Sequence, residues 1–199
     1  MNYRQAEAAD AGDVAELATI AGGGLFEYCL GGASTNETAQ AVALLISALE
    51  DGFSMSNAIV VTEEDASGKE QVAAAMIAYP AAEFAGAETF TTFVQPELLE
   101  PLKGLLEPLN PQTLYIHSLA VRPAFEGRGI HASLIELAED TALGLGLSEV
   151  SVHVWSDHHE AIAIYNQHGF ITQKLVPTDA GEQIGHSGGM LLLAKTLEQ

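Results

Sequence analysis

The sequence has few basic residues. Lys and Arg together number 7, against 27 Asp and Glu, so the 199-residue chain has a formal net charge of −20. Nucleic acids and anionic membranes are bound through Lys and Arg, so this balance argues against both as main partners. It favours a cationic partner such as an amine, although solubility, or a cytoplasm rich in salt, would explain the charge equally well.

Cysteine and long apolar runs are also scarce. Cys29 is the single cysteine, so no disulfide can form within the chain, which fits a reducing compartment. The opening MNYRQAEAAD lacks the apolar core of a signal peptide. No apolar run reaches the roughly 20 residues that span a bilayer. We therefore expect a cytoplasmic protein. We expect no metal site, because Cys29 and the scattered histidines show no ligand spacing.

The composition that remains is globular, with 48% hydrophobic residues, and it fits one domain over residues 1–199. Strands are predicted at Tyr3–Gln5, Asn57–Glu63, Gln71–Tyr79, Leu114–Val121, Val150–Trp155, Phe170–Val176 and Met190–Thr196. Helices are predicted from Asp10 to Gly22, from Ser34 to near Gly52, over Glu97–Leu106, from Ile130 to about Gly144 and from Asp157 to His168. The expected N-terminal caps are Asp10, Ser34 with Glu37 at capping-box spacing, and Asp157 with Glu160. This order predicts a mixed α/β sheet with helices on both faces and an insertion at about 80–112.

The most informative stretch is Leu114–Leu134, which runs from an apolar strand through a Pro-containing turn into Gly127 and Gly129 and then into an amphipathic helix. A helix that starts on glycines presents bare backbone N–H groups and the positive end of its dipole. That arrangement favours an anion, and in particular a phosphate. The alternative is a tight turn into a packed helix.

A second motif, HHEAIAIYNQHGF, follows at His158–Phe170. With the glycine pair and the order of elements, it resembles the GNAT superfamily of acyl-CoA N-acyltransferases. In the family pattern Gly129 is the central glycine, Glu126 stands in place of Gln or Arg, and His131 stands in place of Gly or Ala. The resemblance implies a mostly antiparallel sheet, splayed between Leu114–Val121 and Val150–Val154, with the thioester in the opening.

The resemblance also implies acetyl-CoA as co-substrate. Backbone groups of the strand would pair with the pantetheine arm, and backbone N–H groups of the glycine loop would hold the pyrophosphate, where Arg128 can add an ion pair. His158 takes the place of an Asn that helps to hold pantetheine. The implied cofactor-binding residues are Leu119, Ala120, Val121, Glu126, Gly127, Arg128, Gly129, Ile130, His131, Ala132 and His158.

Two catalytic residues are suggested. Tyr165 matches the family's general acid, and a phenol with an ordinary pKa near about 10 stays protonated at neutral pH and can protonate a thiolate. The alternative is that Tyr165 is simply a core residue. His117 stands where many members place a basic Glu, and the alternation predicts it on the same side as Leu119 and Val121. The alternative is a strand histidine with a satisfied hydrogen bond.

The acceptor is the least determined part of the expected site. The resemblance implies that the acceptor site is built from Phe26–Tyr28, Phe84–Phe93 and Glu182–His186. Glu27 or Glu83 can pair with an ammonium group, or both can be solvated surface charges. We expect direct transfer to the primary amine of a small molecule or peptide, and the resemblance leaves room for a homodimer. The rival hypotheses are a non-catalytic acyl-CoA binding or sensor module and an interaction protein that has lost the ligand.

Overall fold

The computed structural model describes residues 1–50, 52–83 and 94–198. Its sheet has seven strands in the order β1-β2-β3-β4-β5-β7-β6. Their bounds are β1 (Asn2–Gln5), β2 (Ala58–Glu64), β3 (Glu70–Pro80), β4 (Thr113–Val121), β5 (Glu149–Trp155), β6 (Ile171–Val176) and β7 (Met190–Thr196). Neighbouring strands are antiparallel except for β4 and β5, which are parallel. The predicted mixed, mostly antiparallel sheet is confirmed.

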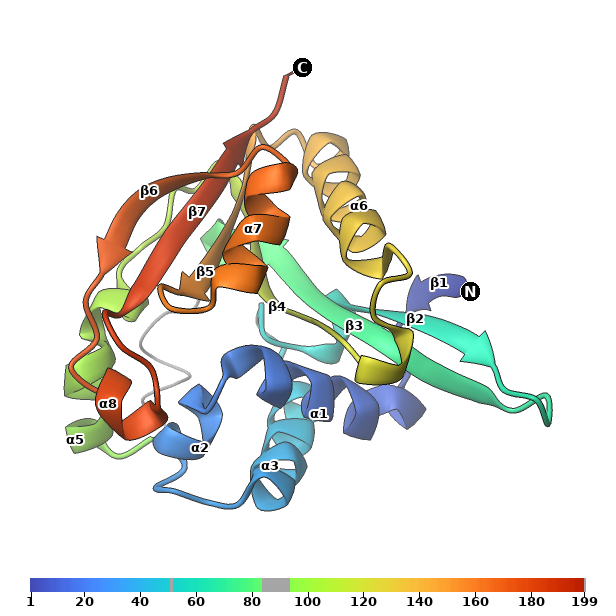
Figure 1. Ribbon diagram of the computed structural model, residues 1–199, viewed down its shortest axis with the longest axis horizontal. Coiled ribbons are helices and arrows are strands. Elements are labelled where there is room, and N and C mark those ends of the chain that lie inside the picture. Colours follow the sequence, from blue (N-terminus) through green and yellow to red (C-terminus); the bar gives the residue numbers. More distant parts are fainter. Residues whose placement is uncertain (51, 84–93, 199) are drawn as a thin grey trace.

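Helices cover both faces of this sheet, as predicted (Figure 1). The α-helices are α1 (Ala11–Gly22), α2 (Leu25–Cys29), α3 (Thr35–Ala48), α5 (Pro96–Leu99), α6 (Ile130–Gly144), α7 (His159–Gln167) and α8 (Gly181–Ile184). Short 3-10 helices are η1 (Ala8–Asp10), η2 (Met55–Asn57), η3 (Ala81–Glu83), η4 (Glu100–Leu106) and η5 (Pro123–Phe125). The helices α1 and α3 pack on one face, which we call the α1 face, and α6 and α7 pack on the other, the α6 face.

Each face has its own apolar core, because strand residues alternate between the two sides of the sheet. On the α6 face, Leu134 of α6 and Tyr165 of α7 join Val152 of β5. On the α1 face, Leu17 and Ile46 join residues of β2, β3 and β4. A third cluster lies where α2 meets α5 and η4. It contains Cys29, whose thiol pKa is raised to about 12 by burial, which makes it an inert apolar side chain.

Local signals in the sequence account for several helix boundaries. Ser34 and Glu37 form the predicted capping box of α3, with Ser34 Oγ accepting from the Glu37 N–H at 3.4 Å. Gly23 ends α1 at a φ of 58°, a left-handed conformation that favours glycine. The expected helix over 97–106 begins as α5 but becomes a 3-10 helix at Glu100, directly before Pro101. Proline lacks the N–H that an α-helix interior needs, which explains the change.

Two predicted helix caps are made differently. The Asp10 carboxylate accepts from Arg4 at 2.6 Å and from the Glu7 N–H, so it closes η1 rather than the first turn of α1. The N-cap of α7 is His158, not Asp157, and its Nδ1 accepts the N–H of Ala161 at 3.1 Å. A side chain that caps one element is not available to cap another, so the choice between neighbouring candidates rests on tertiary contacts.

The parallel pair β4 and β5 separates along its length. Their register pairs Thr113–Ile116 with Glu149–Val152 and ends there. Beyond this point β4 continues to pair with β3 as far as Val121, and β5 continues to pair with β7 as far as Trp155. The two strands therefore diverge from His117 and His153 onward, and this is the splay that the resemblance implied.

Candidate active site

A β-bulge places His117 at the start of the opening. In the β3–β4 register Ile77 pairs with Ser118 and Ala78 pairs with Ile116, which leaves His117 as an extra residue. The bulge reverses the alternation of β4 beyond it. His117 packs on the α1 face, whereas Leu119 and Val121 pack on the α6 face. The prediction that His117 shares a side with Leu119 and Val121 is wrong, because an extra residue shifts a two-residue period by one.

His117 lies among aromatic rings. Its ring centroid is 4.3 Å from that of Phe53, 6.0 Å from that of Tyr115 and 6.2 Å from that of Phe26. Its Nδ1 is buried with no hydrogen-bond partner among the described residues. Burial, with a smaller contribution from His153, lowers the pKa of His117 from 6.5 to about 4. The imidazole is therefore neutral at pH 7 and can accept a proton.

The structure adds two residues to the site that the sequence reading left out. Tyr115, two positions before His117 on β4, has its hydroxyl 3.1 Å from Nδ1 of His153 on β5. Burial lowers the pKa of His153 to about 4 and raises that of Tyr115. In the parallel pair that matches Ile116 with Val152, the next residues along the two strands are His117 and His153. This register is set by the tertiary structure, so the sequence alone gave no signal for the contact.

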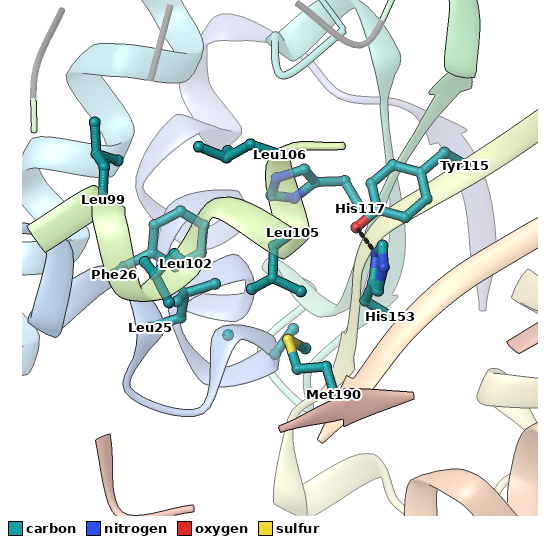
Figure 2. A pocket seen from close by; sticks show the side chains of 12 residues that line it. Leu25, Phe26, Leu99, Leu102, Leu105, Leu106, Tyr115, His117, His153 and Met190 are labelled. Atoms are coloured by element: carbon teal, nitrogen blue, oxygen red, sulfur yellow. Dashed lines mark hydrogen bonds between the residues drawn. The ribbon is translucent and has the colours of Figure 1, made fainter. Parts of the chain in front are cut away.

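These polar groups form one wall of a pocket on the α1 face (Figure 2). Its empty volume is about 770 Å³, including the open mouth. The opposite wall comes from α2, α5 and η4, and Met190 of β7 also lines the pocket. The apolar residues of that opposite wall are Leu25, Phe26, Leu99, Leu102, Leu105 and Leu106.

Tyr165 lies on the other face of the sheet. It is 7% exposed and its ring packs edge to face on Phe170, with centroids 5.2 Å apart. Burial, with a smaller contribution from Tyr115, raises its pKa, so the phenol stays protonated at neutral pH. The sequence left open a core role and an acid role. The structure gives Tyr165 a core position together with the protonation state that an acid needs.

The glycine loop has the geometry of an anion site. Gly127 and Gly129 have φ of 73° and 77°, and Gly129 is the N-cap of α6. A Cβ built on either glycine would meet no atom within 4 Å, so the loop is open on that side. Gly129 has no side chain to accept the N–H groups of the first turn of α6. The backbone from Gly127 to Ala132 therefore fits a pyrophosphate.

The side chains around this loop are less well placed for phosphate. Arg128 donates to Glu63 at 2.8 Å and lies over the ring of Phe125, 5.0 Å from its centroid. His131 is partly buried and its pKa is lowered by burial, with Glu126 opposing the shift. Glu126 itself is exposed. The backbone is thus the part of the loop that fits an anion directly.

Two other implied cofactor-binding residues have contacts of their own. Ile130 is buried in the core under α6 and contributes through its backbone only. The imidazole of His158 is engaged as the N-cap of α7, so a pantetheine contact would require it to leave the Ala161 N–H or to use its other nitrogen. The edge of β4 at Leu119–Val121 faces the opening left by β5.

The segments expected to bind the acceptor differ in where they lie. Phe26 lines the pocket, while one carboxylate oxygen of Glu27 is buried with no hydrogen-bond partner among the described residues. Glu83 is exposed. The segment Phe84–Phe93 lies outside the described residues, and so does the side chain of Glu182.

His186 joins the last loop to the rim of the pocket. Its ring stacks on Trp155 with centroids 4.4 Å apart, Nε2 donates to the Gly23 carbonyl at 3.0 Å, and Nδ1 lies 2.7 Å from Asp157. Trp155 Nε1 donates to the carbonyl of Gly22, which lines the pocket. The loop therefore fixes the end of α1 against the end of β5.

Within residues 1–50, 52–83 and 94–198, no three His, Cys, Asp or Glu side chains are grouped so that they could hold a metal ion. No described helix has the length and apolar character needed to cross a membrane.

This chain is similar to known acetyltransferases in part of its sequence and in its fold. A protein from Jonesia denitrificans described as mycothiol acetyltransferase is 37% identical over 61 residues, which span 31% of this chain and 19% of that protein. An N-acetyltransferase from Staphylococcus aureus Mu50 superposes with a TM-score of 0.71 at 18% identity, covering 98% of this chain and 100% of that one. A GCN5-related N-acetyltransferase from Kribbella flavida gives 0.61 at 19% identity, with 98% and 97% covered.

At these identities the two solved structures show the shared fold. The profile of the Acetyltransferase (GNAT) family matches residues 56–170, which is more than half of the chain and includes β4, the glycine loop, α6 and Tyr165. The chain belongs to the GNAT acetyltransferase family.

Proposed function

We propose that this protein is an N-acetyltransferase that moves an acetyl group from acetyl-CoA directly to a primary amine in a ternary complex. The observation that carries the proposal is the split between β4 and β5, which has the open glycine loop and Tyr165 on one face and the pocket with His117 on the other. Two substrates that enter from opposite faces can meet there without displacing each other, as direct transfer requires.

The residues around the split suit three separate tasks. The free edge of β4 at Leu119–Val121 offers backbone groups to an extended pantetheine arm, in the manner of an added strand. The backbone N–H groups at the start of α6 bind the pyrophosphate. Acetyl-CoA supplies the activated acyl group as a thioester. Backbone dipoles at the β4 edge stabilise charge on the reacting carbonyl.

Proton transfer is assigned to the two faces separately. The neutral imidazole of His117, or a water that it orders, accepts the proton of the attacking amine. Tyr165 keeps its proton at neutral pH and donates it to the departing thiolate. The side chain of Tyr115 lies beside His117, and its hydroxyl contacts His153. These groups form a polar environment for the amine.

The first test is thermal unfolding with and without acetyl-CoA. At about 100 times its dissociation constant a ligand adds about 2.7 kcal/mol, which for a chain of this size corresponds to a rise in Tm of about 5–10 °C. If millimolar acetyl-CoA does not raise the Tm, the chain does not bind the cofactor and the proposal is overturned.

The second test is Tyr165→Phe, assayed as release of free thiol. Loss of a general acid lowers kcat by about 10²–10⁴-fold while the KM for acetyl-CoA stays nearly unchanged. Tyr3→Phe, an exposed change on β1, is the matched control. Equal losses in kcat and in acetyl-CoA affinity would show that Tyr165 has only a packing role.

The alternative is a non-catalytic acyl-CoA binding module. It is favoured by the pairing of Arg128 with Glu63 and by the capping role of His158, because these contacts engage two side chains that were expected to reach the cofactor. A rise in Tm with acetyl-CoA, without turnover over a broad panel of amines, would support this alternative.

A further inference from the structure

The pocket on the α1 face has two chemically different walls. Its polar groups are the side chains of Tyr115, His117 and His153, which lie together where β4 and β5 diverge (Figure 2). The facing wall consists of leucines from α2, α5 and η4 together with Phe26. A molecule that fills the pocket therefore has its reactive group at one end and an apolar surface at the other.

The charges around this pocket limit what it can hold. Among the described residues that line it there is no Asp, Glu, Lys or Arg, and burial keeps both histidines neutral at pH 7. A second ammonium group or a carboxylate in the leucine-lined part would be buried without a charged partner among the described lining residues, which is strongly unfavourable. An apolar substituent instead gains free energy in proportion to the apolar surface that it removes from water.

The position of the pocket separates the acceptor from the acyl donor. The residues that form the leucine wall belong to the apolar cores of the α1 face and of the α2–η4 cluster. The glycine loop leads into α6, whose buried residues belong to the core of the opposite face. The cofactor reaches the split from the α6 face, so the pocket is left for the acceptor.

We propose that the acyl acceptor is a primary monoamine with an uncharged apolar substituent, such as an alkyl chain or a phenyl ring, held against Leu102, Leu105 and Phe26. This inference rests on the proposed transfer to an amine. It narrows the expected cationic acceptor to one whose only charge is the reacting amine. The acidic surface then acts on the approach of the ammonium ion, and the pocket selects the rest of the molecule.

The test measures binding and turnover separately on the protein saturated with coenzyme A or acetyl-CoA. Binding is read from the Tm and from calorimetric titration with n-alkylamines of two to six carbons, phenethylamine and the diamines of equal length. Affinity and kcat/KM should rise about fourfold for each added methylene until the pocket is full. Each diamine should bind at least about tenfold more weakly than the monoamine of the same length.

A charge placed in the wall should reverse this preference. Leu105 is only partly buried, so Leu105→Glu places a carboxylate at the leucine wall with limited effect on folding. We expect this variant to bind diamines better than monoamines. Leu44→Glu, at an exposed position on α3 (74% exposed), is the matched control and should keep the wild-type order.

The outcomes separate the inference from the proposed function. Binding that increases with chain length and depends on Leu105, but without transfer, would support the pocket assignment while the proposed function fails. Diamines that bind the wild type as well as monoamines do would overturn the inference. It would also be overturned if hexanoyl-CoA bound more tightly than acetyl-CoA in a Leu105-dependent way, because the wall would then hold the acyl chain.

Discussion

The opening between β4 and β5 is bordered by backbone groups on one face of the sheet and by side chains on the other. On the α6 face, the proposed cofactor site is made of backbone, namely the glycine loop, the first turn of α6 and the free edge of β4. On the α1 face, the pocket is made of side chains from α1, α2, α5, η4 and three strands. A site made of backbone groups depends little on which side chains surround it, whereas a site made of side chains changes its ligand preference when they are substituted.

Apart from Tyr165→Phe, the largest effect is expected on the side-chain face. His117→Ala should lower kcat/KM by about 10²-fold or more, because it removes the proton acceptor nearest the split. His159→Ala, an exposed histidine on α7, is the control and should leave kcat/KM unchanged. If His117→Ala kept the wild-type kcat/KM, the base would have to be a water molecule or another residue.

The dependence of kcat/KM on pH gives a second test of His117 as the base. A base works in its deprotonated form, and burial lowers the pKa of His117 from 6.5 to about 4. The acid limb of kcat/KM should therefore fall near pH 4, with full activity of the base above it. A limb near pH 6.5 that disappears in His117→Gln would show that the imidazole is solvated in the free enzyme.

An intermediate effect is expected from backbone changes on the cofactor face. Gly129→Ala and Gly146→Ala both place a Cβ at a φ above 70°, and neither Cβ meets another atom, so each should cost about 1–2 kcal/mol of unfolding free energy. Only Gly129→Ala should also weaken coenzyme A binding, by about tenfold or more, as measured by calorimetry. Equal affinity in the two variants would contradict a phosphate site at the glycine loop.

The smallest effect is expected from a side chain on the cofactor face. Arg128→Ala removes a partly exposed ion pair with Glu63, so stability should change by less than about 1 kcal/mol and coenzyme A affinity by less than about threefold. A loss above about tenfold would show that Arg128 leaves Glu63 to pair with phosphate. Glu63→Gln, which releases Arg128, should then tighten binding.

The local features of the fold were predictable from the sequence. The capping box at Ser34 and Glu37, the helix end at Gly23 and the strand-to-helix turn at Gly127 and Gly129 each involve residues only a few positions apart. Their conformations follow from side chains and φ preferences that act over one turn of the chain. For that reason the order of strands and helices, and the glycine-led start of α6, could be derived from the sequence.

The pocket on the α1 face required the tertiary structure. The bulge that puts Leu119 and Val121 on the face opposite His117 depends on the register between β3 and β4, and the contact between Tyr115 and His153 depends on where β4 and β5 part. The leucine wall is brought opposite them by the packing of η4 against α2. By itself the sequence determined the elements and the glycine-led turn into α6, because those depend on neighbouring residues. Only the tertiary structure decided which side chains line the pocket, because register and packing are set by contacts between distant segments.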